Sequence, residues 1–447
     1  MSEVQASGKS MKPELHVVGG GLAGAEAAWQ AARRGMLVTL HEMRPVVRTP
    51  AHRSCMLAEL VCSNSFKSME TTAGAGLLKA ELKALGSFLI EAAEEARVPA
   101  GLSLTVDRSV FAETVTERLE SCPGLTLVRE EVREVPDRPL CVLATGPLTS
   151  ASLSSSLAKF VGKENLFFYD ALSPIVSAES IDTAVVYPGS RYGKGEGGFL
   201  NCPFTEEQYR RFREAILGAR VVELQDVDNK CFFEGCLPLE ELAARGYQTL
   251  AFGPLKPVGL TPPTWDRRAF AVLQLRPENR ENTMYGLVGC QTRMTQPEQR
   301  RVFRMVPGLE NARFLRYGAV HRNTYVDSPR VLNSALMATK RPGLFLAGQL
   351  AGGEGYTEAV ATGLLAGVNA WRHASGRELL VPPKVTALGG LVRYICGDES
   401  RHFAPMNFNF GLLPKVNVKG ARRRKELLAE RALDALASWK RTEWDEA

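Results

Sequence analysis

The sequence predicts an α/β protein in which a doubly wound domain is interrupted by a mixed, sheet-rich α+β domain. Near the start of the chain, residues 14–34 have the pattern of a strand, a glycine turn and a helix. Much later, residues 343–348 form an apolar run that ends in glycine and precedes a helix. Between these units, in residues 172–316, the expected strands are short, and proline and glycine are frequent. Strand–helix alternation favours a parallel sheet, and the change of pattern indicates an insertion into it.

The first unit has the spacing of a dinucleotide-binding turn, which is typical of a Rossmann-like domain. An apolar strand leads into Gly19-x-Gly21-x-x-Gly24, and an alanine-rich helix is expected from Leu22 to Arg34. The first glycine permits a tight turn, the second lets backbone N–H groups approach a pyrophosphate, and the third allows helix and strand to pack closely. The helix N-terminus directs positive partial charge at the phosphates. A bound dinucleotide is therefore favoured over a purely structural turn.

A second strand supports the same interpretation. It is expected from Met36 to His41 and leads to Glu42, 18 residues after Gly24. A carboxylate at this distance can accept hydrogen bonds from the ribose of an adenosine. The candidate cofactor-binding residues of this unit are Gly19, Gly20, Gly21, Leu22, Ala23, Gly24, Glu42 and Arg44.

The two glycine units together favour FAD as the bound dinucleotide. A simple NAD-dependent dehydrogenase needs the first unit alone, whereas the flavin end of FAD needs support elsewhere in the chain. The helix expected from Thr357 to Arg372 can direct its positive end at the flavin, where reduction places negative charge. Two unrelated strand–helix turns are the alternative. The candidate residues for this end are Ala144, Thr145, Gly146, Gly348, Gln349, Gly355, Tyr356 and Thr357.

Chain length, net charge and cysteine content limit the classes of protein to which the sequence can belong. A chain of 447 residues is long enough for two domains, and its formal net charge of +6 permits a polyanionic partner. No run of 18 apolar residues is present, so no membrane span is expected. The nine cysteines show no paired framework, which suggests reduced thiols and a cytoplasmic protein. No cysteine and histidine cluster has zinc spacing, so no metal is expected.

The chain divides into three parts by pattern. Residues 1–12 are polar and are expected to be a disordered extension. Residues 13–171 and 317–447 are expected to form one discontinuous FAD-binding domain, and residues 172–316 the insertion. Within the first domain, leucine spacing predicts one helix from Gly76 to Arg97. The C-terminal segment 421–439 predicts an amphipathic helix with a basic start, which can contact phosphates but is more typical of a solvated face.

Two cysteines differ from the rest in their surroundings. Cys62 is followed by Ser63-Asn64-Ser65, a polar run that suits a loop. Cys236 lies between Glu-Gly and Leu-Pro, where a sharp turn can expose it. Both are candidate catalytic thiols. The cysteines expected to be small buried side chains are Cys141, Cys202 and Cys290.

A third polar cluster lies where the chain is expected to return to the first domain. His321, Arg322 and Asn323 are consecutive there. A lone histidine is usually structural, but such a run at a domain junction is a candidate for the lining of a cleft.

With these motifs in place, the chain resembles the bacterial folate- and FAD-dependent tRNA (uracil-5-)-methyltransferases, the TrmFO family, which are relatives of the GidA/MnmG tRNA-modifying flavoproteins. The resemblance extends from Leu15 to the C-terminal helix. It rests on the strings at residues 42–45, 58–65, 144–150, 233–238, 256–260, 317–325, 355–358 and 388–394.

The resemblance implies a reaction and roles for particular residues. Methylenetetrahydrofolate would donate a one-carbon unit to carbon 5 of the uridine at position 54 in the tRNA T-loop. Reduced FAD would supply electrons, and NADH or NADPH would restore it. Cys236 would attack carbon 6 of the uracil, and Cys62 would lie beside the flavin. His321 would stack the pterin against the flavin, with Arg322 and Asn323 as further folate-site candidates.

Two other functions stay open at this point. The same chemistry could act on a ribosomal RNA uridine. Alternatively, the protein could be a GidA-like flavoprotein that needs a partner subunit to modify a tRNA wobble uridine. Oligomeric state and the preference between NADH and NADPH are not readable from the residues.

Overall fold

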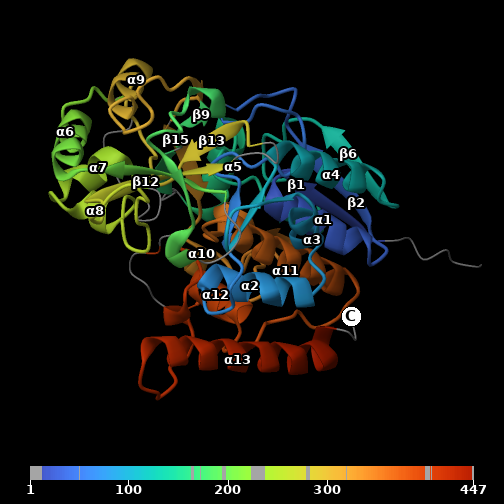
Figure 1. The fold of residues 1–447 in the computed structure, drawn as a ribbon. Helices are drawn as coiled ribbons and strands as arrows, with labels where there is room; N and C mark the ends of the chain where they lie inside the picture. Colours follow the sequence, from blue (N-terminus) through green and yellow to red (C-terminus); the bar gives the residue numbers. More distant parts are fainter. Residues whose placement is uncertain are drawn as a thin grey trace, which may run out of the picture.

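The computed structural model describes residues 13–49, 51–162, 166–171, 173–193, 198–222, 237–277, 282–318, 320–397, 403 and 405–444, with the backbone alone described at 166–171, 193 and 320–323. A parallel sheet with strand order β16-β7-β1-β2-β6 forms one centre of the molecule (Figure 1). Its strands are β1 (Glu14–Val18), β2 (Leu37–Glu42), β6 (Leu125–Arg129), β7 (Cys141–Leu143) and β16 (Leu344–Leu346).

The chain leaves this sheet and later returns to it. β16 follows the predicted insertion in the sequence, yet it pairs in parallel with β7, with Leu344 opposite Cys141. Parallel strands of this kind need long crossover connections, and here one such connection contains a second sheet. The predicted α/β class with a sheet-rich insertion is confirmed. The proposed boundaries at residues 171/172 and 316/317 stay predictions.

Two helices from opposite ends of the chain pack closely against each other. Helix α1 (Leu22–Ala32) lies on α11 (Tyr356–Ala374), and glycines make the contact possible. A Cβ atom at Gly363 would lie 2.2 Å from the Ala23 carbonyl oxygen. The backbones therefore touch only because that side chain is absent. This packing brings the N-terminal ends of both helices to one cavity.

The single helix predicted over residues 76–97 is wrong. The structure has α2 (Gly74–Ala84) and α3 (Phe88–Glu95) instead, separated by a break at Gly86, where φ is +77°. The Ser87 side chain accepts a hydrogen bond from the Ile90 N–H and caps α3. The leucine spacing runs across the break because both helices bury leucines in the same core. Leucine spacing alone therefore did not reveal the break.

The insertion has its own sheet and its own core. Six antiparallel strands have the order β10-β11-β12-β13-β9-β14. Phe204, Phe212, Leu273 and Phe303 are among the buried side chains of a hydrophobic cluster separate from that of the main sheet. The strands are β9 (Ile175–Ser177), β10 (Tyr187–Pro188), β11 (Leu200–Phe204), β12 (Ala271–Pro277), β13 (Met284–Leu287) and β14 (Phe314–Arg316), and the helices are α6 (Glu206–Leu217), α7 (Leu239–Ala244), α8 (Thr249–Phe252) and α9 (Gln296–Phe303).

The remaining elements complete and connect these two centres. β8 (Leu166–Ala171) and β15 (Val320–Tyr325) pair antiparallel where the chain leaves the main sheet and returns. Helix α13 (Ala421–Trp439), red in Figure 1, lies along the edge of the molecule below α2. In the described part of the chain, no helix is long and apolar enough to cross a membrane. The other elements are β3 (Ser65–Ser68), β4 (Arg97–Val98), β5 (Ser103–Val106), α4 (Arg108–Glu120), α5 (Ala151–Val161), α10 (Ser328–Val331), α12 (Ala387–Cys396), and the short turns η1 (Ala178–Ser180), η2 (Arg191–Gly193), η4 (Gly348–Ala351), η5 (Phe410–Leu412) and η6 (Lys440–Trp444).

Candidate functional site

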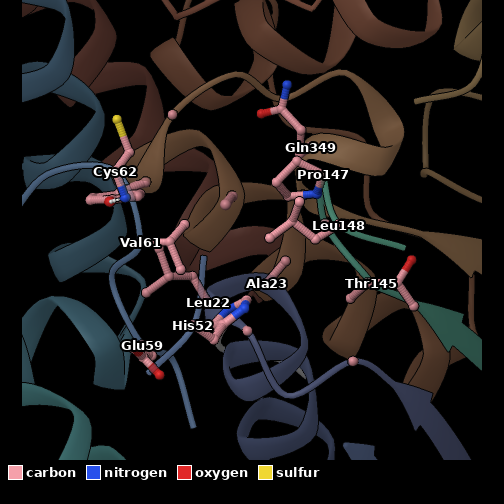
Figure 2. A pocket seen from close by; sticks show the side chains of 18 of the residues that line it. Leu22, Ala23, His52, Glu59, Val61, Cys62, Thr145, Pro147, Leu148 and Gln349 are labelled. Atoms are coloured by element: carbon pink, nitrogen blue, oxygen red, sulfur yellow. Dashed lines mark hydrogen bonds between the residues drawn. The ribbon is translucent and has the colours of Figure 1, made fainter. Parts of the chain in front are cut away.

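One cavity of about 390 Å³ brings the two glycine units together. Its walls come from the turn before α1, the segment after β7, the start of α11 and the sheet of the insertion. In Figure 2, Cys62 and Gln349 lie in the upper part of the view, and His52 and Glu59 in the lower part. The predicted residues that line it are Gly19, Gly20, Gly21, Leu22, Ala23, Glu42, Arg44, Cys62, Ala144, Thr145, Gly146, Gly348, Gln349, Gly355 and Tyr356.

Four groups of predicted site residues either do not line the cavity or have side chains outside the described part of the structure. Gly24 does not line the cavity, and Thr357 is buried with its hydroxyl 3.5 Å from the Phe66 carbonyl oxygen. The side chains of residues 321–323 are outside the described residues, although their backbone belongs to β15. Cys236 also lies outside the described residues.

The glycine turn has the shape that a pyrophosphate requires. A Cβ atom at Gly24 would lie 1.8 Å from the Gly19 carbonyl oxygen, so this glycine serves helix–strand packing. A Cβ atom at Gly21 would meet no atom within 4 Å and would point into open space at the start of α1. That open space lies at the positive end of the helix, where a phosphate fits.

Glu42 sits at the end of β2 in a network of hydrogen bonds. Its Oε1 accepts from the Arg44 backbone N–H at 3.0 Å and from Arg44 Nε at 2.8 Å, and its Oε2 accepts from the Gly20 N–H at 3.0 Å. Burial works to raise the pKa of Glu42, but the hydrogen bonds and charge of Arg44 outweigh it, so the pKa lies below its usual value. A carboxylate has about four acceptor positions, so Oε2 can also accept from a ribose hydroxyl. Arg44 is itself held by Glu59 at 3.1 Å.

The loop that carries Cys62 is held by side chains from distant parts of the chain. The Tyr356 hydroxyl accepts from the Cys62 and Ser63 backbone N–H groups, both at 2.9 Å, and donates to the Ser63 carbonyl at 2.8 Å. Burial raises the pKa of Tyr356, so its hydroxyl keeps the proton that it donates. Arg316 of β14 donates to the Cys62 carbonyl at 3.1 Å and to the Ser173 carbonyl at 3.0 Å. Cys62 is thereby fixed at the junction of the two cores.

The start of α11 also forms part of the cavity wall, next to the Cys62 loop. Gly348 has φ +72° and donates its N–H to the Thr362 hydroxyl at 2.8 Å. The Gln349 side-chain amide donates to the Glu354 carboxylate. Gly355, with φ +106°, precedes the helix and lines the cavity. The positive end of α11 therefore faces the cavity, and its assignment to the flavin end stays a prediction.

Several lining residues were not singled out from the sequence. Lys67 lines the cavity with φ +65°, and Arg276 and Arg316 reach it from the insertion sheet. Behind Lys67, burial lowers the pKa of Lys79 to about 7, and burial raises that of the nearby Glu358. Arg316 directly precedes residues 317–325, one of the sequence strings on which the family resemblance rests. That position is the one sequence signal that could have identified Arg316.

The three cysteines expected to be buried, Cys141, Cys202 and Cys290, are confirmed as buried. Burial also raises the pKa of each thiol, so these side chains stay protonated. They are therefore poor candidates for nucleophiles.

A parallel sheet with a glycine turn, a second glycine segment and a cavity between them defines the class of dinucleotide-binding proteins with a two-part site. Residues 14–378 match the family model described as "Glucose inhibited division protein A". The chain is similar to the methylenetetrahydrofolate--tRNA-(uracil-5-)-methyltransferase TrmFO of Aquifex aeolicus (strain VF5), with 52% identity over 431 residues, 96% of this chain and 97% of that protein. The TrmFO of Lactobacillus delbrueckii subsp. bulgaricus is 48% identical over 439 residues, 98% of this chain and 100% of that protein.

Solved structures show the same fold. Aquifex aeolicus GidA in its form II crystal superposes with a TM-score of 0.71 and 17% identity, covering 96% of this chain and 74% of that chain. The chain belongs to the GidA family and, within it, to the TrmFO methyltransferases.

Proposed function

We propose that this protein methylates carbon 5 of the uridine at position 54 in the T-loop of tRNA, with methylenetetrahydrofolate as one-carbon donor, FAD as cofactor and NADH or NADPH as reductant. The observation that carries the proposal is the cavity that joins a two-part dinucleotide site to a fixed cysteine loop, in a chain about half identical to TrmFO proteins over its length. We also propose that the protein is cytoplasmic, which the lack of a paired cysteine framework in the sequence supports.

The residues present fit FAD. The open space at Gly21 and the start of α1 suit the pyrophosphate, and Glu42 suits the adenosine ribose. Gly348, Gly355 and the start of α11 suit the flavin end. FAD, when bound and reduced, supplies the electrons that convert a methylene group into a methyl group.

The chain's own part in the chemistry is assigned to two cysteines and one histidine. Carbon 5 of uracil is a poor nucleophile. Addition of the Cys236 thiolate to carbon 6 moves an electron pair to carbon 5, which then attacks the methylene carbon of the folate. Loss of the carbon 5 proton expels the folate as the carbon–nitrogen bond breaks toward nitrogen, and uptake of a hydride equivalent at the methylene carbon releases the thiolate and completes the methyl group. Cys62 is held within the cavity wall beside the flavin end, and His321 orients the pterin by stacking. A T-loop uridine must be swung out of its stack to reach this cavity.

The test is a reconstituted reaction. Purified protein is incubated with methylenetetrahydrofolate, NADPH and unmodified tRNA or ribosomal RNA transcripts, and 5-methyluridine is mapped in the product. We expect it at tRNA position 54. Product in ribosomal RNA alone would favour the first alternative, and a requirement for a second protein would favour the GidA-like one.

The basic start of α13 gives a prediction about RNA binding. Arg422 and Arg423 are exposed and share Glu426 as a partner at 3.0 and 3.4 Å, which leaves a net positive charge there. Replacing Arg422, Arg423 and Arg424 with alanine should weaken tRNA binding. The slope of log affinity against log salt should fall by about 0.7–0.9 for each phosphate that the variant no longer neutralises.

The control for this prediction is Arg211→Ala, because Arg211 is an exposed arginine paired with a glutamate in the same way but lies on α6 of the insertion, outside the basic run. Its removal should leave the salt dependence of tRNA binding close to that of wild type. If the slope of log affinity against log salt is unchanged in the triple variant, the basic run faces solvent and does not contact the RNA.

A further inference from the structure

The insertion carries an exposed tyrosine in an unusual backbone conformation. Tyr192 is 65% exposed, and its φ of 62° and ψ of 20° place it in the left-handed region. That region is unfavourable for a bulky side chain, which crowds the backbone there. Such strain persists only where surrounding contacts impose it, and it clusters at functional sites. Here the strain is not offset by burial of the ring.

The contacts that impose this conformation are well defined. The Tyr192 N–H donates to the Gly259 carbonyl at 2.9 Å. The neighbouring Arg191 donates from Nε to the Gln274 side-chain oxygen at 3.1 Å and from a terminal nitrogen to the carbonyls of Lys256 and Val258 at 2.7 and 2.8 Å. These bonds fasten the 191–192 turn to β12 and to the 256–259 loop.

The tyrosine ring rests on a glycine that leaves room for it. Gly259 has φ +80°, and a Cβ atom there would lie 3.1 Å from three carbons of the Tyr192 ring. Glycine therefore lets one face of the ring lie flat on the backbone. Because the residue is 65% exposed, the remaining surface of the ring is open to solvent. We call this ring on its glycine support the aromatic shelf.

The shelf is connected to the wall of the cavity by one strand. Gln274, which Arg191 contacts, accepts through its backbone carbonyl from the Val288 N–H at 3.0 Å, and Val288 lines the cavity. Arg276 also lines the cavity and lies two residues further along β12, on the same face as Gln274. Two residues of a strand span roughly 7 Å. The strand that anchors the shelf through Arg191 therefore also contributes to the cavity wall.

Exposed cationic side chains lie in the segment 253–268, which includes the glycine under the tyrosine ring. Lys256, Arg267 and Arg268 are exposed, and Asp266 is the one acidic residue in the stretch 253–268. Trp265 and Ala269 pack with Leu260 in a small apolar cluster, which holds the 265–268 loop next to the glycine that supports Tyr192. An open ring beside cations matches a nucleobase with its phosphate.

We propose that Tyr192 is a stacking platform for an unpaired base of the RNA substrate, next to the uridine that enters the cavity, and that Lys256, Arg267 and Arg268 hold the adjoining phosphates. This inference rests on the proposed function and names the RNA contact surface for it. Base stacking on an aromatic ring is tolerant of sequence, so the shelf positions the loop, and other contacts select the base.

The experiment compares two substitutions at one position. Tyr192→Gly removes the ring and also relieves the left-handed backbone, so it should leave FAD content and thermal stability unchanged or improved. Tyr192→Phe keeps the ring and is the matched control. We expect the glycine variant to bind a T-arm hairpin RNA about ten-fold more weakly, within the range for loss of one stacked base, and the phenylalanine variant to bind within about two-fold of wild type.

A spectroscopic readout separates stacking from a structural role. T-arm hairpins carry 2-aminopurine at single loop positions, and its fluorescence falls when the base stacks. At one position, we expect quenching with wild type and Tyr192→Phe and no quenching with Tyr192→Gly. Wild-type RNA affinity and quenching in the glycine variant would overturn the proposal, as would loss of FAD in that variant. Failure of wild type to form 5-methyluridine would refute the proposed function instead, because the binding and quenching measurements need no turnover.

Discussion

The Cys236→Ala variant should form no 5-methyluridine while keeping its fold and its flavin spectrum. No neighbouring side chain that acts as a general base can replace a thiolate that adds to carbon 6. We therefore expect a loss of at least on the order of 10³-fold in turnover. Leu239, three residues later, donates its N–H to the Gln291 carbonyl at 2.7 Å, and Gln291 lines the cavity. The chain that follows Cys236 therefore reaches the cavity wall. Turnover is measured with saturating tRNA, folate and reductant.

A mechanism-based trap separates Cys236 from Cys62. RNA with 5-fluorouridine at the target should form a covalent adduct with the wild-type enzyme, because fluorine blocks the proton loss that frees the enzyme. The Cys62→Ala variant serves as the control, since Cys62 belongs to the cavity wall and its loss can also lower turnover. The adduct should require the Cys236 sulfur. An adduct that maps to Cys62, or near wild-type methylation by Cys236→Ala, would contradict the assignment and favour a route without cysteine attack on the base.

Alanine at two glycines of the first turn should give different defects. At Gly24 the new Cβ would lie 1.8 Å from the Gly19 carbonyl oxygen, a backbone atom that cannot move without separating helix α1 from β1. Overpacking of this kind costs about 1–3 kcal/mol or more, so Gly24→Ala should lower the melting temperature and lose FAD together. At Gly21 the Cβ meets no protein atom within 4 Å. Gly21→Ala should therefore stay folded and bind FAD more weakly, by ~10-fold or more, because the methyl group occupies phosphate space.

The measurements are flavin content after gel filtration and the thermal midpoint of the apo and FAD-loaded forms. Gly218→Ala is the control, because Gly218 ends α6 with φ −88° and its Cβ would make an ordinary contact at 3.5 Å. A stable, FAD-rich Gly24→Ala variant would show that helix and strand can separate there. Full FAD affinity in Gly21→Ala would show that the pyrophosphate does not bind at this turn.

Local sequence was enough to predict the parts of the site that are built within one strand–turn–helix unit. The turn from Gly19 to Gly24, the carboxylate at Glu42 and the helix that begins at Tyr356 each depend on neighbours in the chain. Their backbone conformations are set by missing Cβ atoms and by strand and helix patterns, which short-range rules describe well. The same locality misled the prediction over residues 76–97, because spacing of leucines reports which side is buried and does not report a break at Gly86.

The sequence by itself thus determined the fold class and the two glycine units that the structure brings to one cavity, and its family strings led to the roles proposed for Cys236, Cys62 and His321. Only the tertiary structure decided how the Cys62 loop is held, because Tyr356 lies 294 residues further along the chain and Arg316 254 residues. It also decided that the insertion sheet supplies a wall of the cavity and that the turn of the exposed Tyr192 is fastened to a strand of that sheet. Hydrogen bonds between such distant residues depend on how sheets and helices pack as a whole, and no pattern within a short window of sequence records that packing.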